Sequence, residues 1–171
     1  MGGGISFGPG AGAVLLAGVR GLRRPPPLWT CPKCRKRYAN RRQQHSCGRW
    51  TLAAHFRGRP RARALLRALV AAVRAHGRFT VEPQKSRITF MARMRFLNLV
   101  PAREHLRVSL ILGRRVDSKR FTAVQAFGPR CVMHTFALRD EADLDGEIRA
   151  LLAEAAAVGR QEGIYAPGPG A

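Results

Sequence analysis

Three cysteines and one histidine near the N-terminus constrain this chain more than any other feature. Cys31 and Cys34 are separated by two residues, and His45 and Cys47 follow after ten further residues. Zinc in proteins prefers four nitrogen and sulfur ligands in a tetrahedron, and a Cys-x-x-Cys turn brings two thiolates to one ion. The spacing therefore predicts a Zn²⁺ site formed by Cys31, Cys34, His45 and Cys47.

Four protein ligands leave no open coordination position, which favours a structural zinc over a catalytic one. Residues 29–50 are too few to build their own core, so the metal is expected to supply the free energy of folding. Nearby cations such as Lys33 and Lys36 favour thiolates. The closing His-x-Cys pair is tighter than the usual gap of roughly three to five residues. An accidental cluster or a redox dithiol therefore remain alternatives.

The charge of the chain is strongly positive and unevenly distributed. The formal net charge is +21 and the sequence pI is about 11.8. Of the 31 Lys and Arg residues, 29 precede Asp140, whereas seven of the ten acidic residues lie from Asp140 onward. Such a surplus is typical of proteins that bind nucleic acid or another polyanion. Because 27 of the basic residues are Arg, a GC-rich coding sequence explains part of the charge without selection for binding, and both explanations stay open.

Two groups of residues are candidate anion ligands. The first surrounds the Cys/His segment, where aromatic side chains either stack on bases or pack against the module. Its basic members are Arg35, Lys36, Arg37, Arg41 and Arg42. The second group follows a polar turn and suits a small oxyanion, although a solvated turn with an edge strand is the simpler alternative. Its members are Gln84, Lys85, Arg87, Arg93 and Arg95.

The same turn invites comparison with metal-dependent nucleases, in which an acid two residues before a lysine binds the metal. Pro83, not an acid, stands two residues before Lys85, and Glu82 is one position too early. The chain also has no P-loop, nucleophile elbow or dinucleotide-binding glycine pattern. Whether the protein is an enzyme stays uncertain, and a binding role is favoured.

The rest of the chain predicts an α+β fold. Residues 61–76 form an amphipathic helix between Pro60 and Gly77. Extended segments follow at residues 79–82, 87–91, 93–99, 106–112 and 131–138, whereas 117–127 is either a short helix or an edge segment. Asp140 is the expected N-cap of a last helix that ends at Gly159. The predicted fold is a small N-terminal zinc-binding module followed by an antiparallel sheet packed by two helices.

These patterns divide the chain into four parts: a disordered or extraneous extension (1–28), the Cys/His zinc module (29–50), the α+β domain (51–159) and a disordered tail (160–171). The segments WTCPKCRKRYANRRQQHSCGRWTLAAHFRGRP, FTVEPQKSRITFMARMRF and GPRCVMHTFALRDEADLD resemble a bacterial family of uncharacterised proteins, domain of unknown function family 5655, with a zinc-ribbon-like N-terminal segment. The resemblance covers Trp29 to Gly159 and implies no catalytic residue. Where the family pattern has a glycine after the second cysteine, this chain has Arg35.

The function expected from the sequence is a zinc-stabilised module that binds nucleic acid, DNA or RNA, or another polyanion. The alternatives are a small-ligand or protein-interaction domain and, less favoured, a phosphoesterase or nuclease. No apolar run approaches the ~18 residues that a membrane-spanning helix needs, and clustered thiols suit a reducing compartment, so we expect a cytoplasmic protein without a membrane partner.

Overall fold

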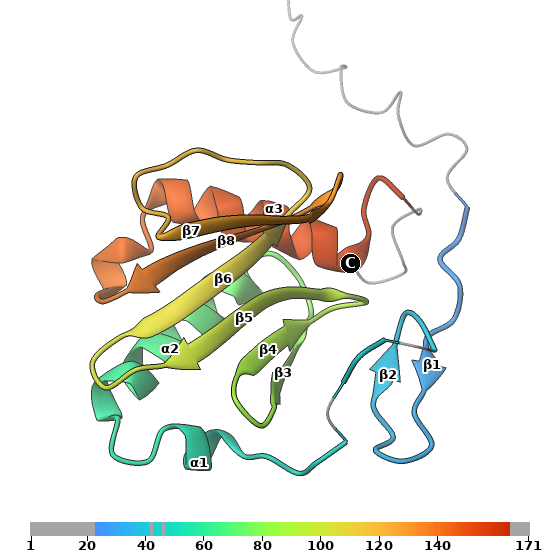
Figure 1. Ribbon diagram of the computed structural model, residues 1–171, viewed down its shortest axis with the longest axis horizontal. Coiled ribbons are helices and arrows are strands. Elements are labelled where there is room, and N and C mark those ends of the chain that lie inside the picture. The colour runs from blue at the N-terminus through green and yellow to red at the C-terminus, as the bar shows by residue number, and fades with distance from the viewer. Residues whose placement is uncertain (1–22, 42, 46, 165–171) are drawn as a thin grey trace, which may run out of the picture.

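The computed structural model describes residues 23–41, 43–45 and 47–164, and Figure 1 shows their arrangement. A small antiparallel hairpin, β1 (Trp29–Thr30) and β2 (Arg37–Tyr38), stands beside a larger unit. That unit begins with the short helix α1 (Leu52–His55) and contains one sheet and two longer helices. The predicted fold class, α+β with an antiparallel sheet packed by two helices and a Cys/His cluster at the N-terminal end, is confirmed.

The large sheet is antiparallel throughout, in the order β3-β4-β5-β6-β8-β7. Its strands are β3 (Thr80–Pro83), β4 (Ile88–Met91), β5 (Arg95–Pro101), β6 (Leu106–Leu112), β7 (Ala123–Gly128) and β8 (Cys131–Leu138). Strands β3 to β6 follow one another as a meander, whereas β7 lies outside β8 at the far edge. The segment whose structure the sequence left open therefore ends in an edge strand.

Helix α2 (Pro60–Arg74) forms where the apolar stripe predicted it. Proline occupies its first turn, where no intrahelical N–H partner is needed, and Gly77 follows its end with φ +119°. Leu65, Leu66 and Leu69 are buried on the inner side, together with Val73, whereas Arg67 points outward and is exposed. The stripe is thus part of the core, and only the arginine side remains available to partners.

Helix α3 (Gly146–Arg160) lies on the same face of the sheet as α2 and packs on β5, β6 and α2. The predicted start of this helix is wrong. Asp140 instead caps a single 3-10 turn, η1 (Glu141–Asp143), in which the Asp143 carboxylate accepts the backbone N–H of Asp140 at 3.0 Å. Asp145 caps α3 and accepts the N–H of Ile148 at 3.1 Å. The chain needs this extra turn to pass from the sheet to the helix layer.

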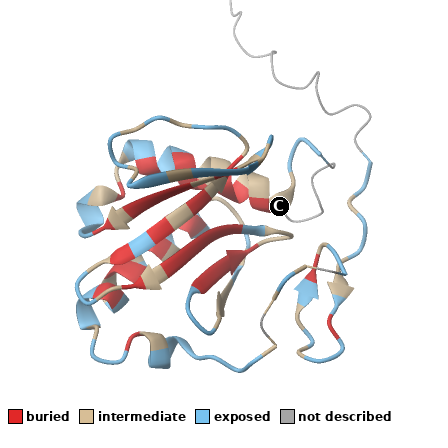
Figure 2. Ribbon diagram, in the orientation of Figure 1, coloured by how far each residue is buried: buried red, intermediate tan, exposed pale blue. Residues whose placement is uncertain are grey.

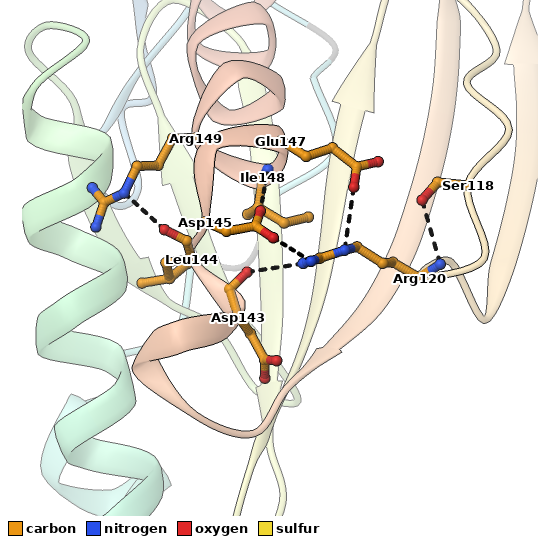
Figure 3. Close-up of polar contacts among 8 residues, drawn as sticks. All are labelled: Ser118, Arg120, Asp143, Leu144, Asp145, Glu147, Ile148 and Arg149. Atoms are coloured by element: carbon orange, nitrogen blue, oxygen red, sulfur yellow. Dashed lines mark hydrogen bonds and ion pairs between the residues drawn. The ribbon is translucent and has the colours of Figure 1, made fainter.

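Arg120, in the connection between β6 and β7, fixes the start of α3 (Figure 3). Its guanidinium donates to the carbonyl of Asp143 at 3.3 Å, contacts the Asp145 carboxylate and lies 3.2 Å from Glu147. These acids also lie at the positive end of the helix dipole. The charges at this corner are therefore used within the fold.

The end of α3 lies one residue beyond the predicted glycine. Gln161 adopts the left-handed conformation (φ 63°) that closes the helix. Gly159 has a different role, because a Cβ atom at this position would lie 2.5 Å from Cδ1 of Phe96. The glycine therefore allows α3 to approach β5 closely.

One apolar core occupies the space between the sheet and the two helices. Figure 2 shows buried residues along the central strands and on the facing sides of α2 and α3, whereas the β1–β2 hairpin is mostly exposed or half-buried. In the part of the chain that the structure describes, every helix is too short or too polar to cross a lipid bilayer. The proposed extension and tail fall largely on residues 1–22 and 165–171, which lie outside the described residues.

Candidate metal centre and the surfaces beside it

The turn after β1 positions the first two metal-ligand candidates. The N–H of Cys31 donates to the carbonyl of Lys36 at 2.9 Å, and the N–H of Arg35 donates to the carbonyl of Cys31 at 2.8 Å. Arg35 has φ 60°, the left-handed conformation that glycine adopts most easily. The structure thus explains why a glycine suits this position and shows that Arg35 adopts the turn nevertheless.

The four predicted ligands converge. The ligand atoms of Cys31, Cys34, His45 and Cys47 all lie within 4.8 Å of one another, the only such group of three or more His, Cys, Asp or Glu side chains among the described residues. Sγ of Cys31 is 3.9 Å from Sγ of Cys47, which is 3.3 Å from Nε2 of His45. Tetrahedral Zn–S bonds of about 2.3 Å would place two sulfurs about 3.8 Å apart. These side chains could therefore bind a metal ion.

His45 is oriented by its other ring nitrogen. Nδ1 lies 2.8 Å from the carbonyl of Gln43, so Nδ1–H donates to that oxygen and the lone pair of Nε2 faces the sulfurs. An outer hydrogen bond of this kind sets the tautomer of most metal-binding histidines. The carbonyl of Gln43 raises the pKa of His45, although burial opposes this effect. Sequence reasoning did not identify Gln43, because a backbone acceptor leaves no side-chain signature.

The thiols of Cys31 and Cys47 differ in acidity. A hydrogen bond from the backbone N–H of Cys34, opposed by burial and aided by His45, lowers the pKa of Cys31 to about 6. Burial, followed by the contacts with Cys31 and Cys34, raises the pKa of Cys47. At neutral pH Cys31 is thus a ready thiolate, whereas Cys47 must release a proton when a metal binds. The affinity for metal should accordingly fall as the pH falls.

A small apolar contact joins the hairpin to the sheet. Tyr38 is only 2% exposed and stacks on the ring of His45, with centroids 4.3 Å apart. Tyr38 and Cys31 form a buried cluster with Met91 of β4, and Lys36 pairs with Glu82 of β3 at 3.3 Å. Tyr38 therefore packs within the module and is not available to stack on a base. Glu82 belongs to the same contact between hairpin and sheet, as the partner of Lys36.

A groove of about 390 Å³ lies beside the Cys/His cluster. Its basic lining residues are Lys33, Arg35, Lys36 and Arg49, and Glu82, the partner of Lys36, is its one acid among the described residues. Trp50 forms one wall, is 40% exposed and lies over Gly48, where a Cβ would be 2.7 Å from the indole nitrogen. The groove combines cations with an accessible aromatic ring.

The structure divides the predicted anion ligands. Arg35 and Lys36 line the groove beside the cluster, Arg37 and Arg41 are exposed elsewhere on the module, and Arg42 lies outside the described residues. In the second group, Lys85 is exposed in the turn between β3 and β4, and Arg93 donates to Gln161 and to the carbonyl of Pro26. Gln84, Arg87 and Arg95 line hollows over the sheet. The turn is thus not one site.

Sequence reasoning missed a row of polar residues on the sheet face turned away from the helices. Cross-strand register places Thr89, Asn98, Ser109 and Thr135 side by side on four strands. The signal was present as single polar residues within apolar strands, but strand order was needed to join them.

The fold and the cluster together define an α+β domain preceded by a Cys/His module. Residues 52–156 match the family described as Domain of unknown function (DUF5655), and the chain belongs to that family. The match covers most of the α+β domain and none of the four metal-ligand candidates. Neither a search of curated proteins nor a search of solved structures found a match for this chain.

Proposed function

We propose that this protein is a zinc-stabilised nucleic-acid-binding module, in which the metal shapes residues 29–50 and the groove beside it binds the phosphate backbone. Thiolate and imidazole ligands in a closed set of four are the donors that Zn²⁺ prefers, and they leave no position for catalysis. A reducing, cytoplasmic compartment suits such thiols.

The observation that carries the proposal is the basic groove against the metal cluster. Arg35 follows Cys34 directly and Arg49 lies two residues after Cys47, so the metal ligands fix the backbone that carries both cations. No ion pair within the described residues occupies either guanidinium. Cations held in this way can neutralise backbone phosphates, and the release of the counterions that surrounded those phosphates favours binding. A partly exposed indole such as that of Trp50 can stack on an unpaired base.

The test combines metal analysis with a salt titration. Purified protein should contain one zinc per chain by elemental analysis. Fluorescence anisotropy with a single-stranded oligonucleotide should give an affinity that falls with salt, with a log-log slope of about 0.7 per phosphate contacted.

The variants Arg35→Ala and Arg49→Ala should each weaken oligonucleotide binding. Each should also reduce the log-log slope by about 0.7, the amount expected for the loss of one phosphate contact. Arg67→Ala is the matched control, because it removes the same charge from the outer side of α2. Loss of affinity equal in all three variants would contradict the proposed groove, and binding that is insensitive to salt would contradict a nucleic-acid backbone as the ligand.

A further inference from the structure

The sheet face turned away from α2 and α3 carries a row of polar side chains, of which all but Ser109 are buried. The Thr89 hydroxyl donates to Oδ1 of Asn98 at 3.1 Å, and the hydroxyls of Ser109 and Thr135 are 2.9 Å apart. Thr89, Asn98 and Thr135 are each less than 9% exposed. Because Oδ1 of Asn98 accepts from Thr89, the amide N–H groups of Asn98 keep their donors for another partner.

Asn98, Ser109 and Thr135 of this row line a hollow of about 550 Å³, within the range of roughly 300–1,000 Å³ that small-molecule sites occupy. Arg87 and Arg107 lie on either side of Val100, because Ile88 pairs with Leu99 and Val100 pairs with Arg107. Both arginines line the hollow together with Asn98 and Ser109. Two guanidinium groups thus stand at one end of a floor of hydroxyl and amide groups.

A second hollow, of about 270 Å³, adjoins the first across the Thr89–Asn98 hydrogen bond and is lined by Arg95 and Arg130. Burial lowers the pKa of Arg95, and the charge of Arg87 lowers it further. No Asp or Glu in the described part of the chain lines either hollow. Within the two hollows the arginine side chains therefore have no carboxylate of the described residues beside them.

Several arginines elsewhere in the domain form ion pairs with acidic side chains. Arg114 pairs with Glu154 at 2.9 Å, and Arg120 contacts the acids that begin α3. Among the ion pairs of the described residues, none includes Arg87, Arg95 or Arg107. No carboxylate of the described residues therefore pairs with these three guanidinium groups, and they are available to an anionic ligand.

We propose that this face binds a small polyhydroxylated molecule with one phosphoryl group, a sugar phosphate in class. Arg87 and Arg107 hold the phosphoryl group, while Asn98, Ser109 and Thr135 receive the hydroxyls. A phosphoryl dianion matches two guanidinium groups better than a carboxylate does. The described residues that line the larger hollow include no aromatic ring, so they offer no platform for a stacked base. The site is separate from the groove beside the metal cluster.

Isothermal titration of the full metal-loaded chain with ribose 5-phosphate tests the proposal, with ribose and inorganic phosphate as separate probes. Ribose 5-phosphate should bind, and each fragment should bind at least about tenfold more weakly. Equal affinity for inorganic phosphate would overturn the sugar part of the proposal. The absence of heat with ribose 5-phosphate up to about 10 mM would overturn it entirely.

Variants locate the site. Arg87→Ala and Arg107→Ala should each weaken ribose 5-phosphate binding by about tenfold or more, since each removes a charge-assisted contact. Both side chains are exposed, so the variants are expected to fold. Arg67→Ala and Arg35→Ala should leave the affinity unchanged. A loss in Arg67→Ala equal to that in Arg87→Ala would overturn the site. The unchanged affinity of Arg35→Ala separates this site from the proposed nucleic-acid groove.

Discussion

The Cys/His module and the α+β domain are held together by different forces. The buried cluster of the module contains Cys31, Tyr38 and Met91, and the last of these belongs to the sheet of the domain. The domain has a continuous core of leucine, isoleucine, valine and phenylalanine side chains from its helices and central strands. Apolar burial is proportional to the area removed from water, so it can stabilise the domain but not the module. For the same task the module has Cys31, Cys34, His45 and Cys47, whose converging side chains could bind a metal ion.

Removal of the metal should give the largest effect and separate the two regions. In zinc-finger peptides the metal contributes about 10–16 kcal/mol at neutral pH. We therefore expect chelation, or Cys47→Ser, to abolish hydrogen-exchange protection in residues 29–50 and to leave protection in β5, β6 and α3. Cys131→Ser removes a cysteine outside the cluster, so residues 29–50 should keep their hydrogen-exchange protection in that variant. A metal-free protein with a fully protected hairpin would contradict this division.

A side chain at Gly159 should have the opposite effect to metal removal, because it should destabilise the α+β domain and leave the Cys/His module intact. The added methyl group of Gly159→Ala would overlap Phe96, and overpacking of this kind costs about 1–3 kcal/mol. Thermal unfolding of the domain should shift down by about 5 °C or more, while zinc content stays unchanged.

Gly146→Ala provides the control within the same helix, because a Cβ there meets no atom within 4 Å. Its melting temperature should remain equal to that of the parent protein or rise slightly. Equal destabilisation by the two substitutions would show that the contact with Phe96 is not the cause.

Acid should weaken the domain through His134. Its Nε2 accepts the N–H of Val116 at 2.9 Å, and its side chain is buried among the strands. Burial lowers the pKa of His134 below its ordinary value of 6.5. The unfolded chain then binds the proton more readily than the folded one. The contribution of neutral His134 to the free energy of unfolding is therefore complete above pH 6.5 and is lost as the pH falls below that value.

Because His134 binds a single proton, its contribution cannot change the free energy of unfolding by more than about 1.4 kcal/mol per pH unit. Denaturant unfolding followed by hydrogen exchange of β6 and β8 should show this loss, and His134→Gln should show a shallower dependence on pH. Identical slopes would exclude His134 as the titrating group.

Arg35→Gly should give the smallest effect and sharpen the contrast within the module. Relief of the left-handed conformation should stabilise the folded turn by about 1 kcal/mol, net of the freedom that glycine gains in the unfolded chain. Competition with a chelator should then show a metal affinity about fivefold higher. Oligonucleotide binding should weaken at the same time, because a groove cation is lost. A parallel rise of both affinities would contradict the role given to Arg35.

Structural elements were predicted correctly where the residues that determine them lie close together in the sequence. The stripe of Leu65, Leu66 and Leu69 predicts α2 because helical neighbours are neighbours in sequence. The start of α3 was misplaced because Asp140 and Asp145 are both good caps, and only the need for a turn between sheet and helix decides which one begins the helix. Strand β7 was left open because its pairing with β8 depends on residues that follow it.

The sequence by itself determined the four metal-ligand candidates, the class of fold and the excess of positive charge, since spacing, periodicity and composition are local properties. Tertiary structure alone decided which cations act together. The register of β4, β5 and β6 brings Arg87 and Arg107 to one hollow beside Asn98, whereas Lys85 and Arg93, which the sequence grouped with Arg87, do not line it. Side chains on adjacent strands meet only after the strands have paired, and that pairing is a property of the whole sheet.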